Sequence, residues 1–238
     1  MRTLRILYGR VAVTATAFAL ASCAVTPPGA PGPAVDAPTL HVGDRWVYHG
    51  TDGYRLPAVW DEIHEVTAIG PEGITVRVTL SGPTVDINRM EKWLAPGVVS
   101  SGAVYEAETD NFDPPLVRYK FPLTQGESWN QTLRDVDKPP TPYGPIHRYV
   151  AVGGYEPVTT PAGTFNALRM RIIMQLDDET FWRYPTECDN LVWYAPAVSA
   201  MVKEEKRSSY RNKGGPDASG NPFAQNATLV LTSFTHGR

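Results

Sequence analysis

The segment Ile74–Leu80, Ile-Thr-Val-Arg-Val-Thr-Leu, alternates strictly between apolar and polar side chains. A period of two over seven residues places the apolar side chains on one face, which is typical of a half-buried antiparallel strand. Residues 168–176 alternate in a similar way, and further strand-like segments follow, separated by clusters of Gly, Pro, Asn and Asp. Helical periodicity is nearly absent. The sequence therefore predicts an all-β fold, an antiparallel curved sheet or an incomplete barrel or sandwich.

Short motifs that occur twice in the same order indicate an internal repeat. Trp-x-Ala-Pro-x-Val occurs at 93–98 and 193–198, and a Pro-x-Gly turn precedes a strand in both halves. We expect the Trp before Ala-Pro to pack as core at the end of a strand; a paired aromatic binding site is the alternative. Two similar halves are therefore predicted, about 40–120 and 121–238. The markers are Trp46, Gly73 and Trp93 in the first half and Trp129, Gly163 and Trp193 in the second.

The N-terminus has the three parts of a secretory signal peptide in order. Arg2, Arg5 and Arg10 form a basic start, residues 11–20 are mostly apolar, and small residues precede Cys23. Ten residues span about 15 Å as a helix, roughly half of the hydrocarbon core, so a stable membrane span is not expected here. The Leu-Ala-Ser-Cys ending resembles the lipobox of bacterial lipoproteins. An ordinary cleaved signal that happens to end in Cys is the alternative.

The lipobox resemblance implies that the signal peptide 1–22 is removed and that Cys23 carries lipid, palmitate included. Ala24, where an Asp would signal retention, implies sorting to the outer membrane of the bacterial cell envelope, with the domain facing the periplasm. Acyl chains contribute about 0.8 kcal/mol per buried CH₂, so several together hold a domain on a membrane. Residues 23–38 are rich in Pro and Gly and are expected to form an extended tether, followed by one all-β domain at 39–238.

Charge and cysteine content narrow the classes of partner. Without the three leader arginines, 19 of the 22 basic residues remain against 25 acidic ones, a net charge of −6. This balance argues against nucleic acid and against charge-driven binding to anionic lipid. The mature chain has two cysteines, Cys23 and Cys188. Because the first is expected to carry lipid, no internal disulfide is predicted.

Val158–Ala167, with the turn Thr-Pro-Ala-Gly-Thr-Phe, is followed by Trp-Tyr-Ala-Pro at 193–196 and Val-Lys-Glu at 202–204. This pattern resembles a family of uncharacterised bacterial lipoproteins and envelope β-proteins, mainly over residues 120–210. Ala197 and Ser199 stand where such sequences often have glycine, which affects only turn geometry. The resemblance implies a curved antiparallel sheet or incomplete barrel on a lipid anchor. It implies no reaction.

The catalytic and metal-binding motifs that we sought are missing from the sequence. It contains no Gly-x-Ser-x-Gly, no Ser-x-x-Lys and no closely spaced pair among its five histidines. Glu62 and His64 share one face of a predicted strand, and Lys203–Arg207 mixes both signs; we interpret both as solvated outer faces. Cys188 lies between two acidic residues, which are expected to raise the pKa of its thiol and suppress its reactivity. We therefore expect no enzymatic activity, no cofactor and no metal.

Two functions remain open for such a chain. The Pro-rich loop 135–145 has no counterpart in the first half, and loops of this length are often binding elements. We therefore predict a non-enzymatic envelope component that binds another protein through this loop. The alternative is a carrier that holds an apolar ligand in a half-open β-barrel. The candidate contact residues of the loop are Pro139, Pro140, Pro142 and Tyr143.

Overall fold

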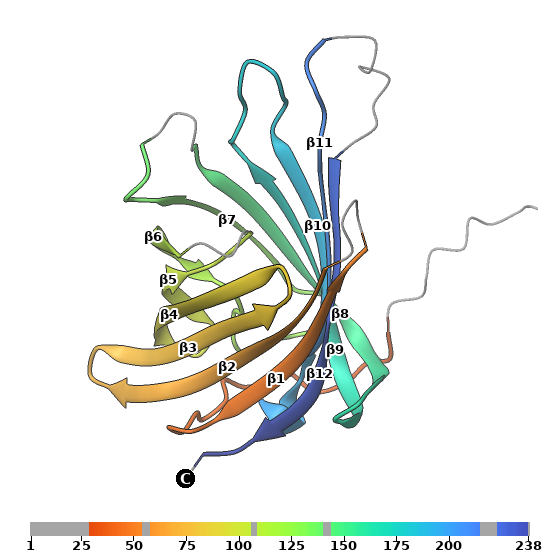
Figure 1. The fold of residues 1–238 in the computed structure, drawn as a ribbon. Helices are drawn as coiled ribbons and strands as arrows, with labels where there is room; N and C mark the ends of the chain where they lie inside the picture. Colours follow the sequence, from red (N-terminus) through yellow and green to blue (C-terminus); the bar gives the residue numbers. More distant parts are fainter. Residues whose placement is uncertain (1–28, 54–57, 106–108, 140–143, 215–222, 238) are drawn as a thin grey trace, which may run out of the picture.

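The computed structural model describes residues 29–53, 58–105, 109–139, 144–214 and 223–237. These residues form twelve antiparallel strands, each paired with the next along the chain, and a short 3-10 turn, η1 (Pro196–Val198) (Figure 1). The all-β prediction is confirmed. The strands are β1 (Arg45–Asp52), β2 (Ala58–Gly70), β3 (Gly73–Gly82), β4 (Val85–Ala95), β5 (Val98–Gly102), β6 (Asp110–Val117), β7 (Ser128–Asp135), β8 (Ile146–Thr160), β9 (Gly163–Leu176), β10 (Thr186–Ala195), β11 (Ala200–Tyr210) and β12 (Phe223–Thr235).

The sheet closes on itself, whereas the sequence predicted a curved sheet or an incomplete barrel. Closure comes from β1, which pairs with β2 on one side and with β12 on the other. Closing a sheet pairs the backbone groups that an edge strand would leave exposed. The sequence could not show this pairing because β1 and β12 are neighbours in space but lie at opposite ends of the domain.

The repeat markers lie six strands apart in the barrel. Trp46 and Trp129 are the second residues of β1 and β7. Gly73 and Gly163 follow the two-residue turns of the β2–β3 and β8–β9 hairpins with φ of 111° and 136°, a region that side chains with a Cβ rarely adopt. Trp93 lies near the end of β4 and Trp193 near the end of β10. The expected boundary between the halves, near residue 120, falls in the connection between β6 and β7.

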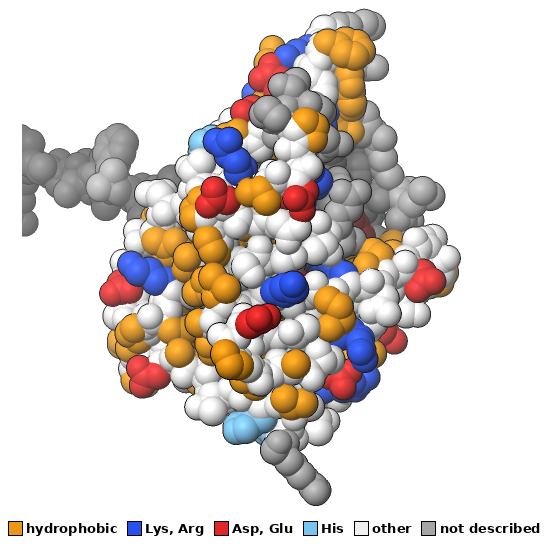
Figure 2. Space-filling view, turned by 90° about the vertical axis from the view of Figure 1, so that its left-hand side faces the viewer, with side chains coloured by type: hydrophobic (Ala, Val, Ile, Leu, Met, Phe, Trp, Pro, Cys, Tyr) orange, Lys and Arg blue, Asp and Glu red, His pale blue; other side chains and the backbone are white. Residues whose placement is uncertain are grey.

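The strands β3 and β4 place hydrophobic side chains on opposite sides of the wall. In β3, Val76 and Val78 are fully buried, as the alternation predicts. In β4, Arg89 lines the interior, whereas Met90 and Leu94 lie on the other face of the strand and are exposed. Figure 2 shows hydrophobic, acidic and basic side chains together on the outer surface of this side of the barrel. Polar side chains on a strand therefore do not mark the outside of this barrel.

The junction between β6 and β7 is the weakest seam of the barrel. Only two residue pairs join these strands, Phe112 with Asp135 and Asp113 with Arg134. Beyond these pairs, the side-chain amide of Gln131 makes the hydrogen bonds to β6 that a neighbouring backbone would otherwise make. Its Nε2 donates to the Pro115 carbonyl at 2.6 Å, and its Oε1 accepts from the Val117 amide at 3.0 Å. The sequence explains part of this irregularity, since the two prolines of β6 have no N–H to donate.

The described part of the predicted tether lies against the barrel. Ala30 pairs with Tyr155 and Val35 with Leu123 through backbone hydrogen bonds of 2.8 to 2.9 Å. The Tyr155 hydroxyl also donates to the Pro33 carbonyl at 2.8 Å, and Val35 is buried. The extended tether predicted for 23–38 is therefore not free over its second half. Residues 1–28, which include the signal peptide and Cys23, lie outside the described residues.

One end of the barrel is packed with apolar side chains. The Trp46 indole donates to the carbonyl of Val198 in η1 at 2.7 Å, and the Tyr48 hydroxyl donates to the Met201 carbonyl at 3.2 Å. Leu229 and Leu231 of β12 are fully buried beside them. Among the described residues, no helix is long and apolar enough to cross a bilayer. Outside this packed end, the interior of the barrel is lined by both aromatic and charged side chains.

Candidate functional site

A cavity of about 240 Å³ lies inside the barrel, above the packed end. Its wall combines aromatic rings with charged side chains from β2, β4, β8 and β11 and from the connections after β5 and β6. A purely apolar lining, which the carrier hypothesis expected, is not found. The charged and tyrosine side chains of the lining are Tyr48, Glu62, His64, Arg89, Glu91, Tyr105, Arg118, Tyr119, Arg148, Tyr194, Glu204 and Lys206.

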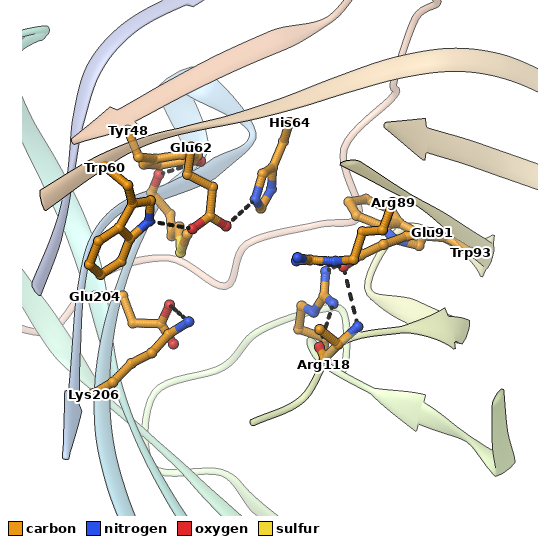
Figure 3. A network of polar contacts seen from close by, with 12 residues as sticks. Tyr48, Trp60, Glu62, His64, Arg89, Glu91, Trp93, Arg118, Glu204 and Lys206 are labelled. Atoms are coloured by element: carbon orange, nitrogen blue, oxygen red, sulfur yellow. Dashed lines mark hydrogen bonds and ion pairs between the residues drawn. The ribbon is translucent and has the colours of Figure 1, made fainter. Parts of the chain in front are cut away.

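Strand β2 contributes a glutamate and a histidine that point into the lumen (Figure 3). The Nε2 atom of His64 lies 2.7 Å from Oε1 of Glu62, and the Trp60 indole donates to Oε2 at 3.3 Å. Burial opposes ionisation of Glu62, but the hydrogen bond and charge of His64, together with the charges of Lys206 and Arg89, outweigh it and lower the pKa of Glu62 from 4.5 to about 2. Our interpretation of Glu62 and His64 as a solvated face is wrong, because both side chains are turned inward and buried or nearly so.

Strand β4 places one carboxylate between two guanidinium groups. Glu91 is 1% exposed, and its Oε2 lies 3.1 Å from Nη1 of Arg118 and accepts the Trp93 indole at 2.9 Å. Its Oε1 lies 3.5 Å from Nη2 of Arg89. Burial opposes ionisation here too, but the nearby Arg118 charge outweighs it, and the pKa of Glu91 falls from 4.5 to about 2. Glu91 is therefore a buried carboxylate whose hydrogen-bonding capacity is already used.

Strand β11 divides its charges between the two faces of the wall. Glu204 and Lys206 line the cavity, 3.4 Å apart. Lys203, Glu205 and Arg207 lie on the other face, where Glu205 contacts both cations. The prediction of a single solvated face for Lys203–Arg207 is thus wrong for its two inward residues. Strand periodicity requires this division, since neighbouring side chains point to opposite sides.

Arg148 of β8 is a buried cation without a carboxylate. Arg148 is 5% exposed, and its guanidinium donates to the carbonyls of Val117 at 2.7 Å and Arg118 at 3.5 Å. No described carboxylate lies within ion-pair distance of it. Burial, and then the like charge of Arg118, lower the pKa of Arg148 to about 10. The group remains charged at neutral pH and helps to close the seam between β6 and β7.

Tyrosines form part of the cavity wall. Tyr119 packs edge-on against Tyr194 with ring centroids 5.1 Å apart. Burial raises the pKa of Tyr119 to about 12, although Arg118 opposes this, and burial also raises the pKa of Tyr194. Both phenols therefore stay protonated at neutral pH. Tyr105, from the connection after β5, reaches across the barrel to the Ser208 hydroxyl of β11 at 2.9 Å.

The structure does not bring the two repeated tryptophans together. Trp93 lines the lumen beside Glu91, whereas Trp193 lies on the opposite face of its strand from the lumen residue Tyr194. The Trp193 indole donates to Glu156 of β8 at 3.0 Å, and the ring is covered. A paired aromatic binding site is therefore not formed, and Trp193 has the structural role expected of it.

Cys188 and the predicted contact loop are the remaining features that the sequence singled out. Cys188 is a free, buried cysteine, and burial raises the pKa of its thiol to about 12, with Asp178 adding to the shift. The direction agrees with the sequence, but the main cause is burial rather than the flanking acids. Of the predicted contact loop, Pro139 is described, while Pro140, Pro142 and Tyr143 lie outside the described residues. Protein binding by this loop stays a prediction.

Sequence reasoning missed the lumen set because charged residues were assigned to the outside. The sequence does contain a pattern that indicates these residues: they occupy alternate positions of two strands and therefore share one face of each strand. Trp60, Glu62 and His64 alternate along β2, and Arg89, Glu91 and Trp93 alternate along β4. A strand face that carries both tryptophan and charged residues fits neither a packed apolar core nor a fully solvated surface.

Among the described residues, no group of three or more His, Cys, Asp or Glu side chains is placed to hold a metal ion.

No protein-family model matches the chain, and no curated protein does. Two solved structures are similar to it in fold. One is described as a candidate lipoprotein from Parabacteroides distasonis, with 14% sequence identity and a TM-score of 0.46 over 86% of this chain and all of that one. The other is described as a candidate exported protein with a YmcC-like fold from Bacteroides fragilis, with 13% identity and a TM-score of 0.45 over 85% of this chain and all of that one.

Proposed function

We propose that this chain is an exported, lipid-anchored binding protein that holds a small molecule in the lumen of its barrel and does no chemistry on it. The observation that carries the proposal is the cavity of about 240 Å³ lined by aromatic rings and ion pairs. Small-molecule sites in proteins combine apolar walls with a few converging polar groups, and barrel interiors are among their usual places. The proposal develops the carrier hypothesis, with a mixed rather than an apolar ligand.

Energetic cost supports a functional role for the charged lumen. Burying charges is unfavourable even when they are paired, and well-packed apolar residues often stabilise a fold as well or better. The packed end of the same barrel, around Trp46 and Leu231, shows that this sequence can fill the interior with apolar side chains. Ion pairs placed around a cavity therefore cost stability that plain architecture does not require.

The protonation states of three lining groups, Glu62, Glu91 and Tyr119, favour binding over acid–base catalysis by those groups. Acid–base catalysis works best with a group whose pKa lies near the ambient pH. The pKa values of Glu62 and Glu91 are about 2, and that of Tyr119 is about 12. These groups keep fixed protonation states at neutral pH. They can donate to a ligand, accept from it or attract it, but they are poorly suited to exchange protons with it.

The export part of the proposal rests on the leader sequence and on the Leu-Ala-Ser-Cys motif that ends at Cys23. Because Ala30 is the first residue that pairs with the barrel, only residues 23–29 separate the lipid from the folded domain. Such a segment spans at most about 25 Å. We therefore propose that the barrel is held close to the membrane surface, in place of the longer spacing expected from a 16-residue tether.

Native mass spectrometry of the mature chain, purified from bacterial envelope and released from detergent in the spectrometer, tests the proposal. A reproducible additional mass of a small molecule, retained by wild type and lost on unfolding, is the expected result. Spectra that contain only the acylated chain across several preparations would contradict ligand binding in the lumen.

A further inference from the structure

The lumen holds more positive than negative charge. Two of its three carboxylates are matched by a permanent cation, Glu204 by Lys206 and Glu91 by Arg118, and the third, Glu62, bonds to the His64 ring. Two guanidinium groups remain beyond these pairs. They are Arg148, whose hydrogen bonds go only to backbone carbonyls, and Arg89, which shares the carboxylate of Glu91 with Arg118.

Arg89 is the less satisfied of the two. Its Nη2 lies 3.5 Å from Glu91, while its Nε and Nη1 are buried and have no hydrogen-bond partner among the described residues. Buried donors are nearly always paired, and each exception calls for an explanation. Figure 3 shows the guanidinium extending from β4 toward the gap that separates it from the Glu204–Lys206 pair. Glu91 does not satisfy it further: Arg118 and Trp93 bond to its Oε2, and its Oε1, which faces Arg89, also accepts the Ala103 amide at 3.5 Å.

We infer that the lumen binds an organic anion, with the carboxylate or phosphate of the ligand paired to Arg89. This inference rests on the proposed function and specifies its ligand. Guanidinium presents a planar fork of N–H donors that matches both anions in two-point contacts. The uncompensated charge of Arg148 in the same lining adds attraction for an anion, because charges interact more strongly where water is excluded.

The other lining residues and the volume of the cavity indicate the character and size of the rest of the ligand. Trp60, Phe121, Ile172 and Val192 line the same cavity and provide apolar surface. A volume of about 240 Å³ lies just below the ~300–1,000 Å³ of pockets that take drug-sized ligands. That space suits one short chain or ring and is too small for a two-chain phospholipid. The ligand class is therefore a small amphiphile with a single anionic group.

A matched set of probes tests the charge requirement in the full chain with Cys23→Ser, which keeps the barrel and avoids detergent. Octanoate, octyl phosphate and octan-1-ol share one chain and differ in the polar group. Binding is followed by calorimetry and by tryptophan fluorescence, since Trp46, Trp60 and Trp93 line the cavity. We expect at least one of the two anions to bind ten times more tightly than the alcohol.

Variants locate the anion. Arg89→Met should reduce the preference for the anion to less than threefold, and Arg89→Lys should retain part of it, since the charge stays and the fork is lost. Arg171→Met is the matched control, because Arg171 pairs with Asp189 on the exposed outer face; its preference should equal that of wild type. If Arg89→Met does not fold, the test rests on the affinities of the anions and of octan-1-ol, compared in wild type and in Arg89→Lys.

The outcomes separate this inference from the proposed function. Equal binding of octan-1-ol and both anions, or an anion preference unchanged by Arg89→Met, would overturn the inference and leave a lumen that binds small molecules. Failure of both anions to bind at millimolar concentration overturns it as well. The proposed function has its own test, since it fails only if native spectra of the envelope protein show no retained molecule.

Discussion

Arg118 and Glu91 form a buried ion pair of 3.1 Å that joins β4 to the chain just after β6. Glu91 also accepts the Trp93 indole and lies within 3.5 Å of Arg89, so one carboxylate organises three side chains on this part of the lumen wall. Arg118 in turn reaches the Ala103 carbonyl at 3.4 Å. The pair therefore holds both the site and the adjoining connections in place.

Glu91→Gln should destabilise the protein strongly. The substitution keeps the shape of the side chain but leaves Arg118 as an uncompensated buried charge. Breaking a buried pair in this way costs about 3–5 kcal/mol. Urea unfolding followed by far-UV circular dichroism measures the free energy of unfolding. Asp189→Asn is the control, since the Arg171–Asp189 pair is about half exposed on the outer face and such pairs contribute about 0–1 kcal/mol. Equal losses in the two variants would contradict the role assigned to Glu91.

Stability should fall in acid over a window set by the two lumen carboxylates. The pKa values of Glu62 and Glu91 drop from 4.5 to about 2 on folding. A lowered folded-state pKa gives stabilisation that is complete above the unfolded pKa and is lost as pH falls toward the folded one. We therefore expect the free energy of unfolding to decrease between about pH 5 and pH 2, by about 3 kcal/mol for each group.

The variant Glu62→Gln identifies the groups responsible for this acid loss. It removes one of the two titrating carboxylates, so its stability should depend less steeply on pH over the same window than that of wild type. Urea midpoints measured at intervals from pH 6 to pH 2.5 give the comparison. Parallel curves for wild type and variant would show that other carboxyl groups cause the acid sensitivity.

The fold class was accessible from the sequence, whereas closure of the barrel was not. Alternation at Ile74–Leu80 predicts β3 directly, because Val76 and Val78 face packed side chains. Closure depends on β1 meeting β12, a contact between distant segments that no local pattern encodes. The seam at Gln131 is equally non-local, since it is a side chain that replaces a strand pairing.

The lumen site was missed for one physical reason. We assumed that charged residues of a strand face water, which holds for a sheet packed over a filled core. A twelve-stranded barrel encloses more space than its side chains fill, so an inward face can carry Glu62 or Arg89 around a cavity. The pairs that make such burial tolerable, such as Glu91 with Arg118, join residues 27 positions apart. Their pairing follows only from the three-dimensional structure.

Gln131→Ala should open the seam between β6 and β7. The substitution removes the acceptor for the Val117 amide and the donor for the Pro115 carbonyl. A buried group left without its partner costs about 1–3 kcal/mol, and these partly buried groups should lie at the lower end of that range. Hydrogen exchange should show faster exchange at Val117, with little change in distant strands. Gln175→Ala, on the exposed face of β9, is the control and should leave both exchange and stability unchanged. Unchanged protection of Val117 in Gln131→Ala would contradict the bridging role.

Cys188 should be unreactive in the folded protein. Its burial raises the thiol pKa to about 12, and the thiolate is the reactive form. In the Cys23→Ser chain, Cys188 is the only cysteine. Iodoacetamide at pH 8 should leave it unmodified over hours by mass spectrometry and modify it fully in urea. Rapid labelling without denaturant would show that the thiol is accessible and that the β10 wall opens readily.

Cys23→Ser should move the protein from the membrane to the soluble fraction of the envelope. Acylation requires the thiol of Cys23, which the substitution removes. Lipid on Cys23 would also hold the barrel near the surface, since only residues 23–29 precede the segment that pairs with Tyr155 and Leu123. Fractionation of envelopes followed by immunoblotting measures the shift, and Cys188→Ser is the control that should remain with the membrane. A Cys23→Ser chain that still sediments with membranes would mean that the barrel surface, where Met90 and Leu94 are exposed, supplies the attachment instead.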